Sequence, residues 1–415
     1  MTLSSLKVKS LLLALIICSS PFSPTFVKAA TVEKIVSFSD HPAPVTEVQF
    51  APGTNTVVSG TKSGGVYLWN RTKNKKVNHF PFLEYNSMGD WLPSTAVQYF
   101  MKALGWNPLA SPVNALSFHP RSSDVLAVGH DFETKTRIFN LKTSKQLQSF
   151  ETYDGTTDLE FSPEGVFLAI LDWRQINVWN TRSHKIHRTL KDKRLHAKND
   201  TAGILPLDLT YSPKGKFLAV SFTDGDLVFW KTQAGKKIKT VNVADTKNSN
   251  EIFSSVNVEA IDISPSGQHL VTVDWQNKLK LWSFPEGKKI NTKKISSDNL
   301  FTDVAFSPQG NVFAVTKGKK LSLWSVKSLK RLSEVKVSGD SLNTLDFSPR
   351  GKYIATGSGY MGNDVTDNSV TVWKNPHYQP DKKPPEKRKK PSQGLPNPSL
   401  ENPKKAKKPS KEAND

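Results

Sequence analysis

Alternating apolar and polar residues divide most of the chain into short predicted β-strands. In one such segment Leu207, Leu209 and Tyr211 occupy every second position, which is the period of a strand with one buried face. This strand ends in a Ser-Pro step, and a turn, a second apolar strand and a third strand ending in an aromatic residue follow it. The pattern predicts an all-β protein.

The same series of strands recurs seven times, at residues 45–70, 113–140, 156–180, 206–231, 258–283, 301–325 and 342–374. A proline marks the end of the first strand in each copy: Pro52, Pro120, Pro163, Pro213, Pro265, Pro308 and Pro349. Except across the first interval, these prolines lie about 40–50 residues apart, which is the spacing of a four-stranded propeller blade. We therefore expect seven blades.

An aromatic residue ends the third strand of every copy at the same register. We expect these side chains to pack between neighbouring blades rather than to bind ligands: Trp69, Phe139, Trp179, Trp230, Trp282, Trp324 and Trp373.

A fourth strand follows the aromatic residue in six copies, but after Trp373 the chain enters a Pro-rich segment. The missing strand is predicted at the other end of the chain, because residues 32–38 (VEKIVSF) resemble the fourth strands of the other copies. Pairing of this N-terminal strand with the last copy would close the ring and leave no exposed sheet edge. The fold class is thus a seven-bladed β-propeller closed by its N-terminal strand, at residues 30–375 with an insertion at 81–112.

Residues 1–29 have the features of a cleavable export signal. Lys7 and Lys9 precede a short apolar run at 11–18, and Val27-Lys28-Ala29 supplies small side chains at the −3 and −1 positions of a cleavage site. The apolar run is far shorter than the ~20 residues that span a bilayer. We predict an exported protein, periplasmic or secreted, with no transmembrane span in the mature chain.

Residues 376–415 form a Pro- and Lys-rich tail that lacks the apolar side chains needed for a packed structure, so we predict that it is disordered. It is either a solvated spacer or an electrostatic tether to an anionic polymer, a wall or lipid headgroups. The candidate contacts for such a surface are Lys387, Arg388, Lys389, Lys390, Lys404, Lys405, Lys407 and Lys408.

Composition narrows the class of protein. The chain has 415 residues, a formal net charge of +20, 37% hydrophobic residues and one cysteine. These values exclude a polytopic membrane protein and a disulfide-rich scaffold. The excess of Lys and Arg points instead to a solvated basic surface or to an anionic partner.

The repeats resemble the WD-repeat β-propeller family over about 345 residues, through the pattern FSPxG…LaV…LW. With the export signal, the resemblance is to a bacterial-type exported WD-repeat protein. It implies a seven-bladed disc that presents surfaces to partners and performs no chemistry of its own. The family's hydrogen-bonded tetrad would survive only in part, through His41, Ser59 and Trp69, because Ser63 occupies the position of the family's Asp.

Other motifs do not support catalysis or cofactor binding. Residues 357–362 spell GxGxxG, but a turn and a predicted strand follow, not the helix that a dinucleotide site requires. His184, His187 and His196 cluster in sequence with only Asp192 as a partner at metal-ligand spacing. We predict no catalytic residue, no cofactor and no metal.

The resemblance also assigns the turns to two faces. One face would carry the Lys- and Arg-rich turns as a positive ring, either solvated or facing an anionic partner. The opposite face would bind the partner. The candidate residues there are His130, Trp173, Arg174, Trp275 and Tyr360, with Trp91 and Trp106 from the insertion, which is a plug over the first blade or a binding lid.

We therefore expect a non-enzymatic, exported scaffold that binds a protein or peptide through its loop-rich face. One alternative is an anionic polymer or surface binder that uses the basic face and tail, for which salt-sensitive binding would be diagnostic. Nucleic acid is not the expected partner. The other alternative is a propeller hydrolase or lactonase, which would need carboxylates or histidines converging at a central channel.

Overall fold

The computed structural model describes residues 30–81, 111–153, 155–192, 195, 204–243, 257–295, 299–359 and 367–380. The chain divides into two units, Met1–Tyr378 and Gln379–Asp415, and every described strand lies in the first. The predicted signal, most of the insertion and nearly all of the basic tail lie outside the described residues. Within the described ranges no helix is long and apolar enough to cross a membrane.

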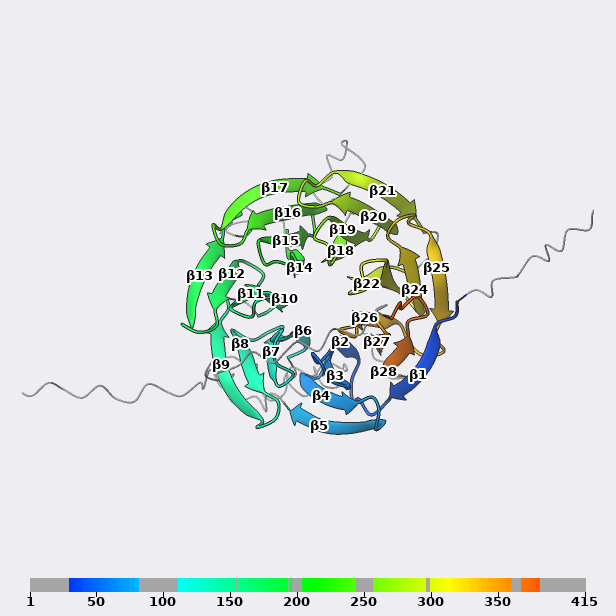
Figure 1. Ribbon diagram of the computed structural model, residues 1–415. Coiled ribbons are helices and arrows are strands. Elements are labelled where there is room, and N and C mark those ends of the chain that lie inside the picture. Colours follow the sequence, from blue (N-terminus) through cyan, green and yellow to red (C-terminus); the bar gives the residue numbers. More distant parts are fainter. Residues whose placement is uncertain are drawn as a thin grey trace, which may run out of the picture. The chain divides into compact units, whose positions relative to one another are not determined.

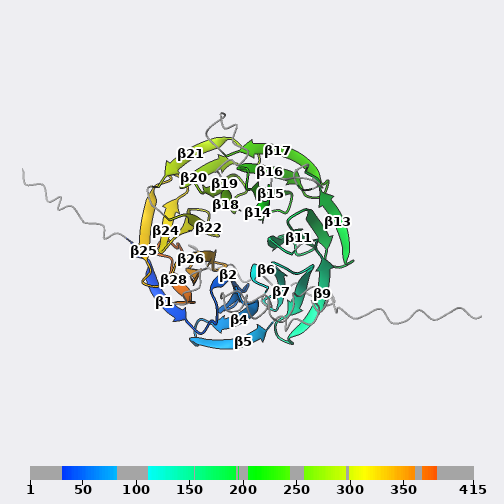
Figure 2. The same ribbon diagram turned by 180° about the vertical axis from the view of Figure 1, so that it is seen from behind.

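The 28 described strands form seven antiparallel sheets of four strands each, arranged around a common centre (Figures 1 and 2). Each sheet is one blade, and its first strand lies nearest the centre. Figure 1 shows the fourth strands, such as β5, β9 and β13, at the outside of the ring. The predicted all-β, seven-bladed propeller is confirmed.

The strands of blades 1 to 4, from the centre outward, are as follows. Blade 1 comprises β2(Val45–Phe50), β3(Thr56–Thr61), β4(Gly65–Asn70) and β5(Lys75–Pro81). Blade 2 comprises β6(Val113–Phe118), β7(Val125–His130), β8(Lys135–Asn140) and β9(Lys145–Glu151). Blade 3 comprises β10(Asp158–Phe161), β11(Phe167–Leu171), β12(Ile176–Asn180) and β13(Lys185–Leu190). Blade 4 comprises β14(Pro206–Tyr211), β15(Phe217–Phe222), β16(Asp226–Lys231) and β17(Lys236–Asn242).

Blades 5 to 7 follow the same order. Blade 5 comprises β18(Val258–Ile263), β19(His269–Asp274), β20(Lys278–Ser283) and β21(Lys289–Lys294). Blade 6 comprises β22(Phe301–Phe306), β23(Val312–Lys317), β24(Lys320–Ser325) and β25(Arg331–Lys336). Blade 7 comprises β26(Leu342–Phe347), β27(Tyr353–Ser358), β28(Val370–Lys374) and, on the outside, β1(Glu33–Phe38).

The ring closes by pairing of the first and last strands of the chain. β1 runs antiparallel to β28, with Glu33 opposite Lys374 and Phe38 opposite Val370. The prediction that the N-terminal strand completes the last blade is therefore confirmed. Further contacts fasten this junction, because Ser333 Oγ in blade 6 donates to the carbonyl of Ala30 at 2.6 Å and lies 2.8 Å from His377 Nε2.

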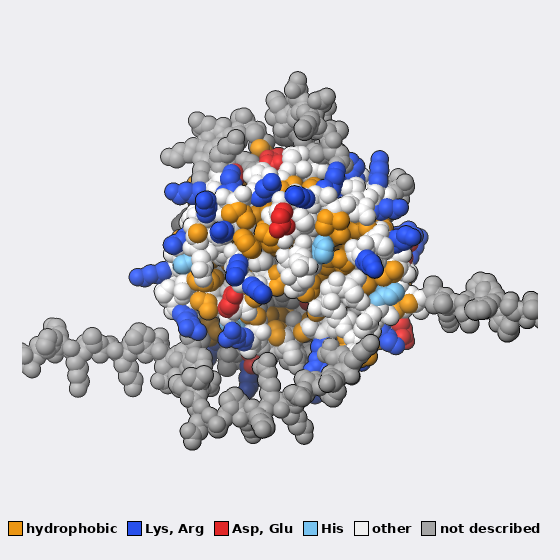
Figure 3. All heavy atoms as spheres, turned by 45° about the horizontal axis from the view of Figure 1, so that its top comes forward, with side chains coloured by type: hydrophobic (Ala, Val, Ile, Leu, Met, Phe, Trp, Pro, Cys, Tyr) orange, Lys and Arg blue, Asp and Glu red, His pale blue; other side chains and the backbone are white. Residues whose placement is uncertain are grey.

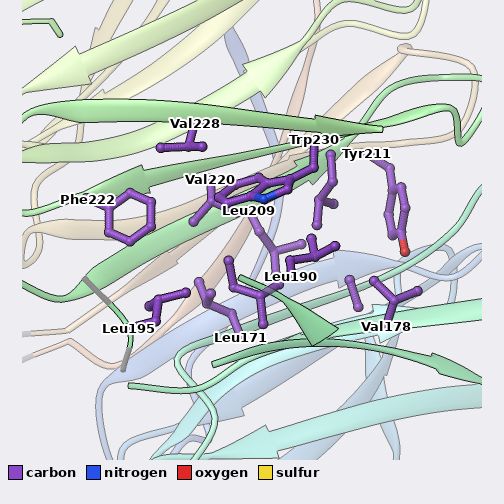
Figure 4. Close-up of a cluster of buried hydrophobic side chains, with 13 residues drawn as sticks. Leu171, Val178, Leu190, Leu195, Leu209, Tyr211, Val220, Phe222, Val228 and Trp230 are labelled. Carbon is purple, nitrogen blue, oxygen red and sulfur yellow. The ribbon is translucent and has the colours of Figure 1, made fainter. Parts of the chain in front are cut away.

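The hydrophobic core lies between neighbouring blades. One cluster joins blades 3 and 4, and in it Trp230 packs among side chains that include Val178, Leu190 and Leu209 (Figure 4). Six of the seven aromatic residues that end the third strands are buried, as predicted. Trp179 is the exception, since it is only partly buried.

Blade 1 retains part of the family's hydrogen-bonded tetrad. His41 Nε2 lies 2.8 Å from Ser59 Oγ, and Trp69 Nε1 donates to the same oxygen at 3.0 Å. Ser63, at the position of the family's Asp, instead forms a hydrogen bond with Thr61. Burial lowers the pKa of His41 to about 4, so this imidazole is neutral. Its hydrogen bond with the Ser59 hydroxyl therefore joins two uncharged groups.

Side chains of the innermost strands link each blade to the next. An inner strand is the edge of its sheet. The N–H groups that point away from its neighbouring strand therefore need partners from outside that sheet. At all seven junctions such an N–H donates to a side chain of the preceding blade, at 2.6–3.0 Å: Phe118 to Gln49, Phe161 to Ser117, Tyr211 to Glu160, Ile261 to Asp208, Phe306 to Asp262, Leu345 to Asp303 and Phe50 to Asp346. We call these bonds the cross-blade ring.

The second residue of several inner strands adds a bond of opposite direction. Thr46, Asn114, Thr302 and Asn343 each donate from the side chain to a backbone carbonyl at the start of the next inner strand or, for Asn114, two residues before it. At these junctions the side-chain donors of the second position and the side-chain acceptors of the cross-blade ring therefore hold one inner strand in register with the next.

Removing one acceptor of the cross-blade ring should destabilise the fold. Asp346→Ala leaves the Phe50 N–H without a partner at the junction where the ring closes, and we expect a loss of about 1–3 kcal/mol in unfolding free energy. Asp346→Asn keeps an acceptor oxygen and should lose much less. Urea unfolding at neutral pH measures both. Equal stability of the Ala and Asn variants would show that the bond carries no weight.

Candidate functional site

The antiparallel blades give the ring two faces. The turns between first and second strands and between third and fourth strands lie on one face, which we call the turn face. The turns between second and third strands, and the connections from one blade to the next, lie on the opposite face, which we call the loop face.

Exposed aromatic side chains gather on the loop face of blades 2 and 3. Phe132 is 51% exposed, Tyr153 is 55% exposed and Trp173 is 39% exposed. The guanidinium of Arg174 lies over the Tyr153 ring, 4.6 Å from its centroid. We call Phe132, Tyr153, Trp173 and Arg174 the aromatic patch. Two of its members, Trp173 and Arg174, are candidates from the sequence.

A buried carboxylate fixes two parts of this patch to each other. Asp172 is buried, and its Oδ1 accepts from the backbone N–H of Arg174 at 2.9 Å and of Gln175 at 2.8 Å. Its Oδ2 accepts from the N–H of Tyr153 at 3.0 Å. Asp172 thereby joins the turn that carries Trp173 to the connection that carries Tyr153.

Further bonds attach the turn that carries Phe132. The N–H of Phe132 donates to Ser111 Oγ at 3.1 Å, and Thr152, next to Tyr153, donates from its N–H to Thr134 O and from its Oγ1 to Glu133 O. The exposed rings of the aromatic patch are therefore presented on a hydrogen-bonded backbone that needs little ordering when a partner binds.

Trp275 lies on the same face but in blade 5, so blade 4 separates it from the aromatic patch. It is 45% exposed, and its Nε1 donates to Glu259 Oε2 at 2.6 Å. Tyr360, Trp91 and Trp106 lie outside the described residues. Of the predicted candidates within the described residues, the structure thus brings together only Trp173 and Arg174.

His130 requires a correction. The sequence suggested an exposed residue of the partner-binding face, but its side chain is 0% exposed at the end of β7. It lies between blades 1 and 2, where its Nε2 is 3.5 Å from Gly64 O. Burial lowers its pKa, so the imidazole is neutral and acts as part of the inter-blade packing.

Sequence reasoning missed Phe132 and Tyr153. Both are aromatic residues in segments that connect strands, where polar residues prevail. An aromatic residue in such a segment was the sequence signal that could have identified them.

The turn face is basic, as predicted. Lysines and arginines occupy its turns in every blade, and most are exposed: Lys73, Lys75, Arg121, Lys142, Lys145, Arg182, Lys185, Lys214, Lys216, Lys231, Lys236, Lys288, Lys327, Lys330, Arg350, Lys352 and Lys374. Figure 3 shows such blue side chains spread over the described surface, with apolar patches between them. The eight basic tail residues proposed for surface contact, Lys387 to Lys408, lie outside the described residues.

Besides Glu259, which bonds to Trp275, the inner strands carry seven carboxyl groups: Glu47, Asp158, Glu160, Asp208, Asp262, Asp303 and Asp346. Burial raises the pKa of Asp262 and Asp303 to about 7 and that of Asp346 to about 8. Asp158 and Asp208 are hydrogen-bonded to each other, and burial together with this neighbouring carboxyl raises the pKa of Asp208 well above its usual range. The sequence had revealed no such constellation, because these residues occupy the polar positions of ordinary alternating strands.

These carboxyl groups resemble a converging acid cluster, but their oxygens have partners. Six of them accept backbone N–H groups of the next blade, and Glu47 Oε1 accepts from Thr344 Oγ1 at 3.3 Å. Among the described residues no group of three His, Cys, Asp or Glu side chains has the geometry of a metal site. Gly357 and Ser358 of the GxGxxG sequence belong to strand β27, whereas residues 360–362 lie outside the described part.

The family model for the WD domain, G-beta repeat, matches residues 32–70, 250–283 and 330–374. These ranges fall on blades of the seven-bladed ring described above. The chain therefore contains WD repeats, and its described strands form a seven-bladed β-propeller.

Curated relatives of this WD-repeat protein are distant. It is 20% identical over 254 residues to the guanine nucleotide-binding protein subunit beta of Oryza sativa subsp. japonica, which covers 60% of this chain and 59% of the rice protein. It is 23% identical over 166 residues to the subunit of that name from Solanum tuberosum (39% and 41%). It is 24% identical over 156 residues to a coronin-like protein of Saccharomyces cerevisiae (37% and 22%). The matches thus span less than two thirds of each relative.

The raised carboxyl pKa values predict how the stability of this propeller depends on pH. Some carboxyl groups have a higher pKa in the folded state than in the unfolded state. Such a group makes its full contribution to stability only when the pH is below the pKa of the unfolded state, about 4. That contribution is lost as the pH rises toward the folded values of about 7 for Asp262 and Asp303 and about 8 for Asp346. Replacing all three by Asn should therefore raise the melting temperature, relative to the wild type, more at about pH 9 than at about pH 5.

Differential scanning calorimetry of the wild type and the triple variant at both pH values measures how far the change in melting temperature differs between them. Glu286→Gln, at an exposed turn, is the control and should change the melting temperature by the same amount at each pH. A triple variant with the same offset at both values would contradict a role for these carboxyl groups in the pH dependence.

Proposed function

We propose that this WD-repeat propeller is an exported, non-enzymatic scaffold that binds a protein or peptide through the aromatic patch of its loop face. The observation that carries the proposal is the combination of three exposed aromatic rings with one arginine on a pre-ordered backbone. Aromatic residues and arginine are the side chains that most often dominate interface energetics. Rigid aromatic anchors also lose little entropy when a partner binds.

A non-enzymatic role is supported by the state of the central carboxyl groups. In a hydrolase or lactonase these groups would have to be available to a substrate or a metal. Here they accept hydrogen bonds that join the blades, so their chemistry serves the fold. The similarity to proteins named guanine nucleotide-binding protein subunit beta agrees with a propeller that works through its surfaces, although the identity is only 20%.

Binding to an anionic polymer or lipid surface is the second candidate function. The lysines of the basic turn face favour it because they attract anionic groups. An affinity based on this attraction would fall steeply with salt. In our proposal this attachment is auxiliary, and the basic tail at 376–415 strengthens it.

Export is part of the proposal. Cleavage after Ala29 would leave every described strand intact, since β1 begins at Glu33, and it would retain the Ala30 carbonyl that accepts from Ser333. Mass spectrometry of protein secreted or released from the periplasm should therefore identify Ala30 as the first residue. An uncleaved chain in the cytoplasmic fraction would contradict the export signal.

The aromatic patch can be tested with a triple variant. Phe132→Ser, Tyr153→Ser and Trp173→Ser together should weaken partner binding by tenfold or more, because they remove the anchors without touching the hydrogen-bonding carboxylate of Asp172. The partner is first isolated by affinity capture with the mature protein at high salt, then its Kd is measured by calorimetry. The matched control replaces three exposed apolar residues of outer strands by Ser: Val77, Ile186 and Ile290.

A partner that binds both triple variants equally would rule out the patch as its site. Capture should also be compared for residues 30–375 and 30–415 at low and high salt. Retention by both at high salt supports the loop-face scaffold, whereas capture lost with the tail or with salt would make this protein a charge-driven surface binder.

A further inference from the structure

A pocket of about 750 Å³ lies on the turn face between blades 3 and 4. It is bounded by the turn that follows β10 in blade 3 and by both turns of blade 4 on this face. Val166, Phe167 and Phe217 provide its apolar surface. Its size falls within the range of ordinary ligand sites, about 300–1,000 Å³.

The rim of the pocket is positively charged. Lys214, Lys216 and Lys231 line it, all three are exposed, and none of them forms an ion pair with another described residue. Glu164 is the one acidic residue of the lining. Arg188 adds a further positive group at the edge, since its Nε donates to the backbone carbonyl of Gln233 at 3.1 Å.

A buried hydroxyl without a partner also lines this pocket. Thr232 is 2% exposed, and its Oγ1 has no hydrogen-bond partner among the described atoms. The equivalent residue of blade 3 is Thr181, whose Oγ1 donates to the carbonyls of Gly165 and Val166. Both threonines make the same backbone bond, Thr181 to Val166 O and Thr232 to Lys216 O, so the difference lies in the side chain. An unpaired buried hydroxyl is costly unless a ligand supplies a partner.

The packing of the turns at this junction differs from that at three other junctions. A Cβ placed on Gly267, Gly310 or Gly351 would have as its nearest neighbour the Cδ of a proline from the preceding blade. At Gly215 the nearest atom is instead the Glu164 carboxylate, at 2.6 Å. At this junction the flexible Glu164 side chain, which lines the pocket, is thus the nearest neighbour of the turn glycine. Figure 4 shows that Tyr211, next to this turn, lies at the end of the inter-blade core opposite Phe222.

We propose that this pocket is a second docking site, for an acidic peptide segment of a protein partner that also carries an apolar side chain. The apolar surface takes the apolar side chain, the three lysines pair with carboxylates, and the Thr232 hydroxyl bonds to a carboxylate or a peptide carbonyl. The occupant is acidic because the rim presents three unpaired lysines against one glutamate. This site is distinct from the aromatic patch, which lies on the opposite face.

The probe is the fluorescein-labelled peptide Glu-Phe-Glu-Leu-Glu, and its binding to the mature protein is followed by fluorescence polarisation at about 0.15 M salt, where charges beyond about 8 Å are screened. The same peptide with Gln in place of Glu should bind at least tenfold more weakly. Ala234→Trp fills the pocket from an exposed turn position without a change of charge, and it should also weaken the acidic peptide at least tenfold. Thr232→Val should weaken it severalfold.

Charge variants separate the pocket from the general field of the basic face. Lys214→Glu, Lys216→Glu and Lys231→Glu together should abolish binding. Lys73→Glu, Lys327→Glu and Lys330→Glu change the charge of the same face equally at other blades, and they should alter the Kd less than threefold. Circular dichroism confirms that each variant is folded.

Equal weakening by the two triple variants, or no effect of Ala234→Trp, would overturn the proposal in favour of diffuse electrostatic attraction. Displacement of the peptide by inorganic phosphate at comparable concentration would also overturn it, because a simple anion would then suffice. The Phe132/Tyr153/Trp173 serine variant should bind the probe like the wild type, so failure of the loop-face assignment and failure of this one are distinguishable.

Discussion

The propeller depends on side chains of its innermost strands that accept hydrogen bonds from the backbone of the next blade. Each four-stranded sheet ends at the centre in an edge strand whose outward N–H groups have no strand to pair with. Gln49, Ser117 and a series of carboxyl groups supply the missing acceptors at all seven junctions. The blades are thus joined by directed bonds at the centre as well as by apolar packing farther out, and together these interactions fix the turns on both faces.

This arrangement separates the charges of the molecule. Acidic groups lie on the inner strands, where burial raises the pKa of Asp262 to about 7 and that of Asp346 to about 8, whereas lysines and arginines occupy the turn face. The loop face carries aromatic rings on a hydrogen-bonded backbone. The protein therefore presents exposed aromatic rings on one face and a positive surface on the other.

Much of the fold could be predicted from the sequence because its signals are local and repeated. Strand alternation, the proline spacing and the aromatic register predict seven blades, and the missing last strand predicts closure by the N-terminus. The cross-blade ring could not be predicted in this way. Asp262 and Asp346 occupy the polar positions of alternating strands, which look the same in sequence whether they face water or accept from a backbone N–H of the next blade.

The candidate site was less predictable for the same reason. Trp173 and Arg174 were found from their type and position, but His130 is buried against the preceding blade, where it contacts Gly64, 66 residues away in sequence. The exposure of Phe132 and Tyr153 likewise depends on how two connections pack side by side. The pocket between blades 3 and 4 depends on contacts between turns of neighbouring blades, such as that of Glu164 with Gly215, which lies 51 residues further along the chain.

Closure by the first strand also has a consequence for the order of folding. β1 pairs with β28, so its partner is the last strand of the propeller to leave the ribosome. Until then the N-terminal strand has no pairing partner, and the last blade lacks its outer strand. Folding of the last blade must therefore wait for the most distant contact in the chain, which makes that step slow and vulnerable to association with other unfinished chains. A chain that crosses a membrane in extended form would complete this step only after both of its ends have arrived on the far side.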